Sequence, residues 1–563
     1  PPHLPTPLPR GRPPPPGLLK IILIAAPPVL LALTAGNAAD AFDSFFRRDD
    51  LPMWLLVFGS VGNLILSLRF IYQWLYSRRA GESELPAGFW IFSLAGAAIV
   101  FVYGILRADV VLILGQSFGL LVYSRNLVIG RRAAAMCLLA AVGLSAQAST
   151  RIEFTLSDSD IYPGTTHDVI VTVPEAYSPD SAACLYVGLD GILCNAPAVI
   201  DSLIASGEMP VTIGVFVQPG VVRDAADNVL RYNRSNEFDA TDGTFGRFLA
   251  EELLPAVEAL TTEDGRPIVL SANPDDHMIF GLSSGGIAAF SAAWFYPGLF
   301  HRVFSGCGTF VPMRGGNDLQ ALVRKNEPKP LRVFLQDGFS DTWNPLFGSW
   351  YEANAMLGTA LEFAGYDCSF DWQEGGHSVR RANEIFADVM RWMWRDYPAA
   401  IIPGKTQNDM LAPMLIEGET WQAAAPLDLG GTPSALYPDS TLAVRTEPDS
   451  NWLWQSLRDP ATGRYTSDQR FYWLHSPDNE VLTVGGMTFD SNGNLWVVTS
   501  AGLQICDQNG RVRAILDLPP GLDASLSCIR IEADGTVRLN GHARRLNVRP
   551  ATPGVRPPSQ GQG

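Results

Sequence analysis

The feature that most restricts the fold of this chain is the turn at residues 281–285, Gly-Leu-Ser-Ser-Gly, between a strand-like and a helix-like run. The apolar run 278–280 leads into the turn and the small, apolar run 285–294 leads out of it. Bulky side chains at either glycine would clash with the neighbouring strand and helix, so the turn is sharp and its backbone strained. A bare G-x-S-x-G is common in a chain with 52 glycines, and it is this setting that makes the motif informative. The pattern predicts that Ser283 is a nucleophile beside a helix N-terminus, whose free N–H groups favour negative charge.

Short strand-like runs alternate with helical patterns from residue 151 to about 400. The strand candidates are RIEFTL, DVIVTV, ACLYVGLDG, VTIGVFVQ, PIVL, HMIFGLSS, VFSGCG and LRVFLQDG. Helical patterns at 244–260, 285–294 and 350–365 each follow a strand candidate. This alternation is typical of a mostly parallel sheet covered by helices. We therefore expect residues 149–400 to form an α/β domain of the α/β-hydrolase type.

A serine nucleophile needs a base to take its proton and an acid to orient that base. In this fold the chain order is serine, acid, histidine. His377, His475 and His542 lie well past Ser283, and the last two fall in a different domain. We predict that His377 is the base, because it stands in a loop between the strand-like YDCSFDW and the helix-like ANEIFADVMRWMW. The remaining histidines of this segment are expected at the surface or at an edge: His167, His277 and His301.

The acid and the oxyanion donors have several candidates. Asp341 is the preferred acid, because it lies in the loop after the strand LRVFLQDG and a carboxylate must leave the sheet edge to reach the base. Asp337 is the reserve, and Glu374 is expected to be a solvated loop charge. The backbone N–H of Ser284 is the expected first oxyanion donor, and the second is Gly191 or Ile192, in the turn after the strand LYVGL.

Nearly all of residues 151–400 resembles the enterochelin esterase group of α/β hydrolases, which is similar to esterases that remove feruloyl and acetyl groups from plant polysaccharides. The resemblance lies in FTLSDSDIYPGTTHDVIVTVP, LYVGLDG, RYNRSNEFDATDGTFGRFLAEELLP, GLSSGGIAAFSAAWFYPGLFHRVFSGCGTF, KPLRVFLQDG and FAGYDCSFDWQEGGHS. It implies a serine carboxylic ester hydrolase with Asp341 as the acid. Arg234 and Glu237 match a family loop near the site entrance, where they either serve the site or brace the loop. The extended N-terminal sandwich domain of true enterochelin esterases is missing, which argues against a siderophore substrate.

Residues 18–130 are mostly apolar and are predicted to form a helical membrane domain after a disordered Pro-rich tail at 1–17. Five segments are candidates for membrane spans: 18–36, 52–76, 88–106, 109–124 and 133–146. The basic loops of this arrangement fall on one side, which the positive-inside rule assigns to the cytoplasm. Residues 131–148 have a basic start, an apolar run and an Ala-Gln-Ala end, so they form either a signal peptide cleaved after Ala148 or a final anchoring helix. Both alternatives place the following residues outside the cytoplasm of a bacterial cell.

Residues 68–127 resemble the small membrane domain at the N-terminus of some lipid-A-disaccharide synthases. The matching residues are Arg69, Gln73-Trp74, Phe89-Trp90, Gly115-Gln116-Ser117 and Tyr123-Ser124-Arg125-Asn126. The resemblance implies a three-helix unit similar to PQ-loop membrane proteins. Arg69 and Gln73 lie one helical turn apart in an apolar segment, where polar groups usually mark a function. The alternative is that Arg69 reaches the membrane interface and Gln73 bonds a neighbouring helix.

Residues 401–548 are predicted to be β-rich, with Asn-Gly turns at 492–493 and 509–510, before a disordered tail at 549–563. They resemble one to two blades of gluconolactonase-like propellers, and are too few to close a ring. An Asn that helps hold a metal in complete relatives has no counterpart in GLDASLSC. We expect neither lactonase activity nor a bound metal in this segment.

Composition limits the function further. The net charge of −16, without long basic runs, argues against nucleic-acid binding. The seven cysteines show no metal-ligand spacing, and we expect no metal or other cofactor. The leading hypothesis is an extracytoplasmic serine esterase, tethered to the lipid bilayer or released, that acts on a small-molecule or saccharide-linked ester. The alternatives are a non-catalytic binding protein with a hydrolase fold, and a membrane protein of lipid A or small-solute handling with the esterase as a fused passenger.

Overall fold

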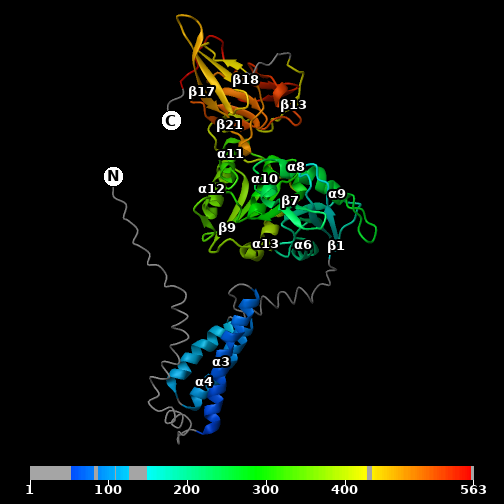
Figure 1. Cartoon of the computed structure of the whole chain (residues 1–563), viewed down its shortest axis with the longest axis vertical. Helices are drawn as coiled ribbons and strands as arrows, with labels where there is room; N and C mark the ends of the chain where they lie inside the picture. Colours follow the sequence, from blue (N-terminus) through cyan, green and yellow to red (C-terminus); the bar gives the residue numbers. More distant parts are fainter. Residues whose placement is uncertain (1–51, 81–86, 108, 126–148, 428–433, 560–563) are drawn as a thin grey trace, which may run out of the picture. The chain divides into compact units, whose positions relative to one another are not determined.

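The computed structural model describes residues 52–80, 87–107, 109–125, 149–427 and 434–559. The chain divides into two compact units, Pro1–Ser145 and Ala146–Gly563. In the first unit, α3 (Met53–Ala80), α4 (Ala87–Leu106) and a shorter helix at Val110–Arg125 follow three of the predicted spans (Figure 1). The other two, 18–36 and 133–146, and the signal-like stretch 131–148 lie outside the described residues.

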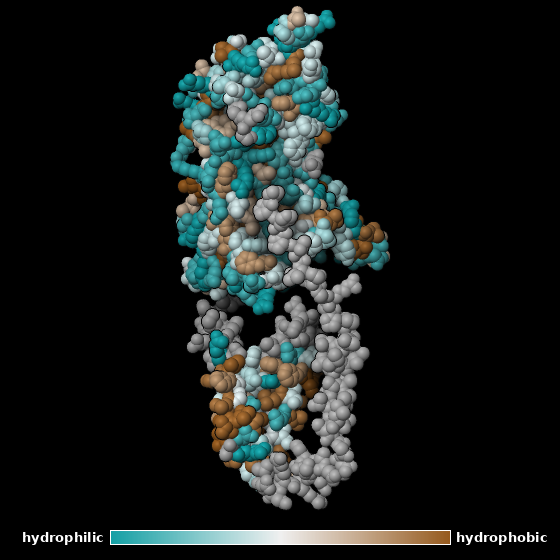
Figure 2. Space-filling model, turned by 90° about the vertical axis from the view of Figure 1, so that its left-hand side faces the viewer, coloured by the Kyte–Doolittle hydropathy of each residue, from teal (hydrophilic) through white to brown (hydrophobic). Residues whose placement is uncertain are grey.

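By length and composition, Met53–Leu75 of α3 and Gly88–Leu106 of α4 could each cross a membrane. The two helices approach closely through glycines, since a Cβ on Gly96 would lie 2.9 Å from the carbonyl oxygen of Gly62. Their outward surface is apolar, as the brown areas of Figure 2 show. The exposed large side chains of this unit include Trp54, Val57, Leu64, Phe70, Ile91, Ile105, Val111, Phe118 and Leu121. Such a surface is costly in water and suits a lipid environment.

An eight-stranded sheet forms the centre of the second unit. Its strands, in spatial order, are β1 (Thr150–Leu156), β2 (His167–Val173), β4 (Thr212–Val217), β3 (Cys184–Leu189), β7 (His277–Leu282), β8 (Arg302–Gly306), β9 (Arg332–Gly338) and β12 (Asp367–Gln373). The pairs β1–β2 and β2–β4 are antiparallel and all the others are parallel. The mostly parallel α/β arrangement that the sequence predicted is confirmed.

One predicted strand, PIVL at 267–270, is wrong. The structure has only isolated bridges there, from Pro267 to Thr261 and from Leu270 to Ala183. The Tyr177 hydroxyl donates to the Pro267 carbonyl at 2.8 Å and accepts from the Val269 amide at 2.8 Å. A side chain therefore satisfies backbone groups that a strand would pair with a neighbour.

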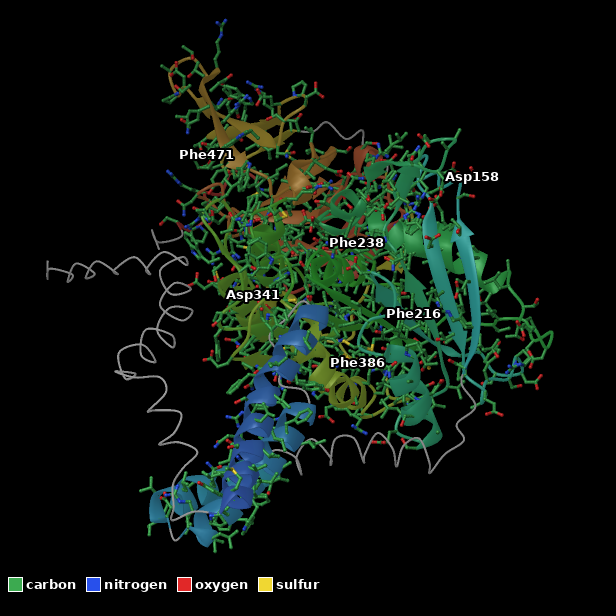
Figure 3. The ribbon with its side chains drawn as sticks, turned by 60° about the horizontal axis from the view of Figure 1, so that its bottom comes forward. Asp158, Phe216, Phe238, Asp341, Phe386 and Phe471 are labelled. Carbon is green, nitrogen blue, oxygen red and sulfur yellow. The ribbon has the colours of Figure 1, made fainter. Side chains whose placement is uncertain are left out.

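Alternating side chains of the strands enter two separate cores. On β3, Leu185 and Val187 face one core, and Tyr186 faces the other. The helices over the first core are α8 (Thr244–Phe248), η1 (Leu249–Leu253), α9 (Leu254–Glu258), α10 (Ser284–Phe295), α11 (Leu319–Lys325) and α12 (Trp350–Ala364). The second core lies under α6 (Ala196–Ala205) and α13 (Val379–Met393). Figure 3 labels Phe216 and Phe386 of this second core and Phe238 of the first.

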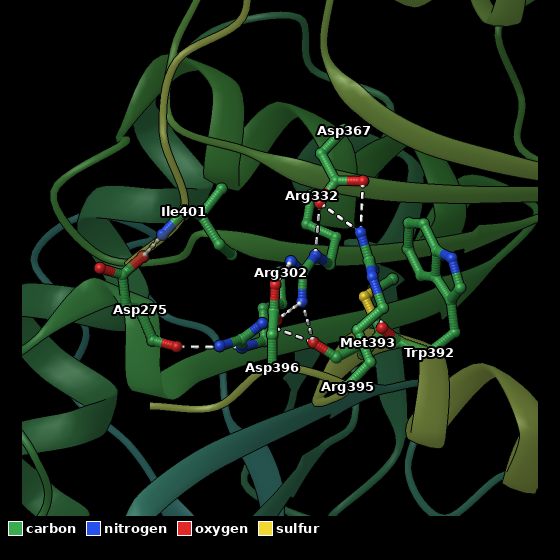
Figure 4. Close-up of polar contacts among 9 residues, drawn as sticks. All are labelled: Asp275, Arg302, Arg332, Asp367, Trp392, Met393, Arg395, Asp396 and Ile401. Carbon is green, nitrogen blue, oxygen red and sulfur yellow. Dashed lines mark hydrogen bonds and ion pairs between the residues drawn. The ribbon is translucent and has the colours of Figure 1, made fainter. Parts of the chain in front are cut away.

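Two buried arginines lie side by side at the starts of β8 and β9 (Figure 4). Arg302 and Arg332 each donate to the carbonyl oxygen of Met393, near the end of α13. Arg332 also binds Asp396 at 2.7 and 2.9 Å and Asp367 at 2.7 Å. His377 lies in the loop just before α13, and this arginine cluster holds the opposite end of α13 at Met393.

The described residues after 401 form three four-stranded antiparallel sheets. Their strands are β13 (Gln422–Ala423), β24 (His542–Arg545), β23 (Thr536–Leu539) and β22 (Ile529–Ile531); β14 (Ser434–Leu436), β15 (Leu442–Thr446), β16 (Trp452–Arg458) and β17 (Tyr465–Trp473); and β18 (Val484–Phe489), β19 (Leu495–Thr499), β20 (Gly502–Cys506) and β21 (Val512–Leu516). The predicted Asn-Gly turns are confirmed between β18 and β19 and between β20 and β21. In both turns the glycine has positive φ, 78° at Gly493 and 79° at Gly510.

These sheets pack against the α/β domain near α11. Glu327 binds Arg544 through two contacts of 2.6 and 2.7 Å, and Lys329 Nζ lies 2.7 Å from both carboxylate oxygens of Asp517. One apolar core runs from the α/β domain into the β-rich segment. The second unit therefore has a continuous interior from the esterase-like domain to the C-terminal sheets.

Candidate active site

The turn after β7 has the strained backbone that the sequence predicted. Ser283 has φ 59° and ψ −122°, a left-handed conformation that is costly for a residue other than glycine. A Cβ on Gly281 would lie 2.1 Å from the Gly285 carbonyl oxygen, so only glycine fits at 281. The Ser283 amide donates to the Gly306 carbonyl of β8 at 2.9 Å, which holds the turn against the sheet. The strain therefore persists because its surroundings fix it.

Three predicted residues meet in one hydrogen-bonded chain. His377 Nε2 lies 2.8 Å from Ser283 Oγ, and His377 Nδ1 lies 2.8 and 3.0 Å from the two carboxylate oxygens of Asp341. The Asp341 side chain is fully buried, whereas 30% of the His377 side chain is exposed. The imidazole therefore faces solvent and substrate while its acid partner is shielded from water.

The loops that carry Asp341 and His377 are tied to each other. The Phe339 amide donates to the Gln373 carbonyl at 2.8 Å, and the Ser340 amide donates to the Gly375 carbonyl at 2.9 Å. These bonds extend the parallel pairing of β9 and β12 beyond the strand ends. The acid and the base are thus positioned by neighbouring strands, although 36 residues separate them.

Asp337, the reserve candidate, lies behind Asp341 and does not contact the base. It is fully buried, and its carboxylate accepts from the Gly338 amide at 2.7 Å and from Asn354 Nδ2 at 2.8 Å. Burial and a hydrogen bond with Asp341 raise the pKa of Asp337 to about 9. Burial alone would also raise the pKa of Asp341, but hydrogen bonds from His377 and Asp337 lower it below its usual value. The opposite directions of the two pKa shifts favour a proton on Asp337 and a negative charge on Asp341.

Glu374, the third carboxyl considered, is exposed, and no hydrogen bond joins it to His377 in the described part of the chain. It stays a surface charge, as expected.

Pairing with the sheet decides between the two candidates for the second oxyanion donor, Gly191 and Ile192. The Gly191 amide donates to the Val217 carbonyl of β4 at 3.1 Å, so it is already used and that alternative falls away. The Ile192 amide has no hydrogen-bond acceptor among the described residues. The Ser284 amide has no acceptor within α10 either, because Ser284 is the first residue of that helix. A Cβ on Gly285 would lie 3.0 Å from Asp190, so the turn that holds Ile192 abuts the start of α10.

Three residues that the sequence reasoning missed support the site. Trp350 Nε1 donates to Thr309 Oγ1 at 3.3 Å, and Thr309 Oγ1 lies 3.5 Å from Ser283 Oγ. Asn354 bonds both Asp337 and the Gly308 carbonyl, each at 2.8 Å. Trp350 and Asn354 lie one turn apart on α12, so a polar Asn on the apolar face of that helix was the signal that could have found them.

Arg234 and Glu237, at the ends of the short helix α7 (Arg234–Phe238), make the contacts of bracing residues. Arg234 binds Asp190 through two contacts of 2.6 and 2.8 Å, and so holds the turn before Ile192. Glu237 is buried, accepts from the Gly220 amide at 3.0 Å and lies 3.1 Å from His167 Nε2. Of the two interpretations that the sequence left open, the geometry favours bracing.

The expectation that His167, His277 and His301 lie at the surface is wrong for two of them. His167 is fully buried against Glu237, and His277 is 5% exposed between the carbonyl oxygens of Leu299 and Ser271. His301 is partly buried and lies 2.7 Å from Asp275. His167 and His277 begin strands that helices and loops cover on both sides. The polar partners of their rings offset the free-energy cost of this burial.

One group of side chains in the described residues could in principle hold a metal ion: Cys307, Asp341 and His377, whose ligand atoms lie within 4.8 Å of one another. Burial raises the pKa of the Cys307 thiol to about 12, so the thiol stays protonated and is a poor ligand. His377 already uses both ring nitrogens toward Asp341 and Ser283. The same atoms fit a proton-transfer chain better than a metal centre.

Two family models match the chain. Residues 162–397 match the family described as "Putative esterase", and residues 58–128 match the Lipid A Biosynthesis N-terminal domain. Neither of these two matches includes residues 401–548, so the gluconolactonase resemblance of that segment stays a prediction.

Among curated proteins, lipid-A-disaccharide synthases are similar to a short part of this chain. A lipid-A-disaccharide synthase of Chlamydia muridarum is 39% identical over 82 residues, which are 15% of this chain and 13% of that protein. A second one, of Chlamydia trachomatis serovar D, is 34% identical over 77 residues and is also covered to 13%. The chain thus spans about an eighth of the length of these relatives.

Similar solved structures match the α/β domain. The enterobactin esterase of Shigella flexneri is 21% identical, with 44% of this chain and 59% of that one covered and a TM-score of 0.32. A ferulic acid esterase is 18% identical, with coverages of 44% and 98% and a TM-score of 0.33. TM-scores of this size carry no argument about function. Residues 162–397 therefore belong to the esterase family by their family match, and residues 58–128 form a Lipid A Biosynthesis N-terminal domain.

Proposed function

We propose that residues 149–400 are a serine carboxylic ester hydrolase that acts through an acyl-enzyme on Ser283. The observation that carries this proposal is the unbroken chain from Ser283 Oγ through His377 to Asp341, with contacts of 2.8 Å on both sides of the imidazole. The match of residues 162–397 to an esterase family supports the same reaction class. A serine in such a chain is activated for attack on an ester carbonyl.

The first half of the reaction acylates the serine. His377 Nε2 takes the Ser283 proton as Oγ forms a bond to the carbonyl carbon, and Asp341 stabilises the imidazolium that results. The carbonyl oxygen becomes an oxyanion, which accepts hydrogen bonds from the Ser284 and Ile192 amides. When the tetrahedral intermediate collapses, the ester C–O bond breaks and His377 returns its proton to the departing alcohol.

The second half releases the acid. His377 takes a proton from water, the hydroxide oxygen adds to the acyl carbon, and collapse returns the proton to Ser283 Oγ. Thr309, 3.5 Å from Ser283 Oγ and held by Trp350, keeps the hydroxyl aligned with the imidazole. No step needs a metal or other cofactor, because protons move only between these side chains, water and the substrate.

We propose a small-molecule or saccharide-linked ester as the substrate. Exposed apolar side chains flank the acid loop, with Phe339 before Asp341 and Trp343 and Leu346 after it, on the hairpin of β10 (Trp343–Asn344) and β11 (Gly348–Ser349). Tyr232, on β6 (Val229–Tyr232) of the hairpin with β5 (Val221–Arg223), is also exposed, two residues before Arg234. Such side chains favour an apolar or aromatic group on the substrate.

The test compares the full-length chain with Ser283→Ala in hydrolysis of p-nitrophenyl acetate. The expected loss in kcat/KM is at least about a thousandfold, because removal of a triad nucleophile leaves only binding and oxyanion stabilisation. Ser291→Ala is the matched control, since Ser291 is buried in α10, the helix that follows Ser283, and its hydroxyl has no partner in the described structure. Mass spectrometry of the quenched reaction should find one acetyl group on the peptide that contains Ser283. Equal turnover by wild type and Ser283→Ala would refute the proposal and favour a non-catalytic role for the fold.

We also propose that this domain lies outside the cytoplasm of a bacterial cell. The proposal rests on the basic residues that the sequence places in alternate loops of the helical unit, such as Arg78, Arg79 and Arg125. Protease added to intact spheroplasts should then degrade the esterase domain, and protection of that domain until lysis would refute the orientation. The size of the membrane-bound and released forms reports whether the chain is cut after Ala148.

A further inference from the structure

Among the described residues of the helical unit, one arginine, Arg69, has no acidic partner. Arg69 of α3 lies where α3, α4 and the helix Val110–Arg125 meet, and its Nη1 donates to Ser93 Oγ at 3.3 Å and to the Tyr123 hydroxyl at 3.0 Å. Ser93 is fully buried and its own hydroxyl donates to the Phe89 carbonyl at 2.6 Å. Both partners of Arg69 are therefore neutral hydroxyl groups, which leave the positive charge uncompensated.

Aromatic rings surround the same guanidinium. Its central carbon lies 4.7 Å from the ring centre of Phe70, 5.5 Å from that of Phe89 and 5.6 Å from that of Tyr123. Rings at this distance attract the cation and hold the planar group in place. They supply no full negative charge, so the guanidinium is positioned without being neutralised.

The part of the guanidinium that remains unused has the shape of an anion clamp. The Nε atom of Arg69 is buried and has no hydrogen-bond partner, and Nη2 has none among the described residues. The Nε and Nη2 hydrogens form the two-pronged edge that binds the paired oxygens of a phosphate or carboxylate. An unsatisfied buried donor is costly, which favours a ligand that accepts from it.

No carboxylate of the described helices reaches this edge. Within residues 52–80, 87–107 and 109–125 the acidic side chain is Asp109, which caps the third helix by accepting from the Leu112 amide at 3.2 Å. Tyr123, the partner of Arg69, lies 14 residues farther along that helix, or about 20 Å at 1.5 Å per residue. Asp109 is therefore at the opposite end of the helix from Arg69.

The position of Arg69 indicates where such an anion comes from. It lies six residues before the end of the apolar segment Met53–Leu75, which is about 9 Å along the helix axis. Ser93 lies six residues into α4, and Tyr123 two residues before the end of the third helix, so the site is at one end of the bundle. Arg125 and the backbone positions of Arg78 and Arg79 lie at the same end, where basic residues attract anionic lipids. The long side chain of an arginine can reach from this depth toward the headgroup layer, where a phospholipid beside the apolar outer surface of Figure 2 carries its phosphate.

We propose that Arg69, with Ser93 and Tyr123, forms a site for the phosphate group of a membrane lipid. The Nε and Nη2 hydrogens of Arg69 donate to two phosphate oxygens, while Ser93 and Tyr123 hold Nη1 and the aromatic rings fix the plane. The site is separate from the esterase triad and does not depend on it.

The test is calorimetric titration of the full-length chain in dodecyl maltoside micelles with dioctanoyl phosphatidic acid. The wild type should bind it, and Arg69→Gln should bind about tenfold to a hundredfold more weakly, because a charge-assisted two-pronged contact is lost. Arg107→Gln is the matched control, because the exposed Arg107 also donates to a tyrosine hydroxyl, that of Tyr103 at 3.2 Å, and lies over its ring. This control should stay within twofold of the wild type.

Further arms identify the ligand. Dioctanoylglycerol, which lacks the phosphate, should not bind, and inorganic phosphate should bind much more weakly than the lipid. Arg69→Lys keeps a positive charge but loses the planar edge, so it should also bind several-fold more weakly, and it tests the site if Arg69→Gln fails to fold. Unchanged p-nitrophenyl acetate turnover in both variants shows that the substitutions leave the esterase domain intact. Equal binding of the lipid by wild type and both variants would overturn the site, and equal binding of inorganic phosphate and lipid would overturn its assignment to a lipid.

Discussion

Replacing the two buried aspartates one at a time separates the acid of the triad from the residue that supports it. Asp341 contacts His377 Nδ1, so Asp341→Asn removes the charge that selects the imidazole tautomer and stabilises the imidazolium. Loss of the acid in a Ser-His-Asp triad lowers turnover by about 10⁴-fold. We expect a loss of this order, about 10³ to 10⁴-fold, in kcat/KM for Asp341→Asn.

Asp337→Asn should have a much smaller effect. Because burial and the contact with Asp341 raise the pKa of Asp337 to about 9, the Asp337 carboxyl favours its protonated, neutral form at pH 7. The amide of Asn replaces this neutral donor toward Asp341, and its oxygen can accept from Gly338 or Asn354 as the carboxyl does. The expected loss is less than about tenfold. Asp337→Leu removes the donor toward Asp341 and one of the acceptors of Asn354, which keeps the Gly308 carbonyl. A hydrogen bond to a charged group contributes about 1.5–3 kcal/mol, or about 10- to 150-fold.

The assay is p-nitrophenyl acetate hydrolysis at pH 7 by the full-length chain and its three variants, with the thermal unfolding of each recorded as a check on folding. The reasoning predicts the order wild type, Asp337→Asn, Asp337→Leu and Asp341→Asn, from fastest to slowest. If Asp337→Asn lost as much activity as Asp341→Asn, the proton would not reside on Asp337. If Asp341→Asn kept its activity while Asp337→Asn lost it, the acid would be Asp337.

Three further outcomes concern stability. The folded-state pKa of Asp337 is raised from 3.8, so the folded chain holds a proton that the unfolded chain releases above about pH 4. The stabilisation from this group is therefore complete below that pH and is lost as the pH rises toward 9. The free energy of unfolding should fall between pH 5 and pH 8 with a slope of up to about 1.4 kcal/mol per pH unit that Asp337→Asn removes, and an identical slope in both proteins would contradict this prediction. Gly281→Ala should lower stability by about 1–3 kcal/mol or more, since its Cβ would lie 2.1 Å from a carbonyl oxygen, whereas Gly298→Ala, with nothing within 4 Å, should change the melting temperature little. Arg332→Met should destabilise the chain by about 2–3 kcal/mol, less than the loss of a fully buried ion pair, because its aspartate partners are part-exposed. It should leave kcat/KM within twofold, because Asp337 lies five residues along β9 from Arg332, or about 16 Å. A large loss of turnover in folded protein would show that the cluster of Figure 4 affects the site.

Much of the esterase site follows from local patterns in the sequence. The small residues around Ser283 between an apolar strand and a helix predict the sharp turn, because only glycine fits beside it whatever the rest of the chain does. The position of His377 follows in the same way from a loop between a strand-like and a helix-like run. Period-two and helical patterns depend on each segment alone, and so they predicted most of the sheet and the helices that cover it.

The predictions that were wrong depend on contacts between residues far apart in the chain. The strand at 267–270 does not form because the hydroxyl of Tyr177, some 90 residues earlier in the chain, takes its backbone groups. His167 was expected at the surface, and it is buried because Glu237, 70 residues away, gives its ring a partner. Such partners come from contacts that no local pattern records.

The sequence by itself thus identified the candidate groups of the proposed reaction: a serine on a strained turn, a histidine in the loop after a strand and a carboxylate between them in the chain. Only the tertiary structure decided which carboxylate meets His377, that Asp337 keeps a proton behind it, and that Val217 occupies the Gly191 amide and leaves Ile192. The physical reason is that identity and order along the chain specify which groups are available. Burial, and the distance between groups 36 and 94 residues apart, set their protonation and their partners.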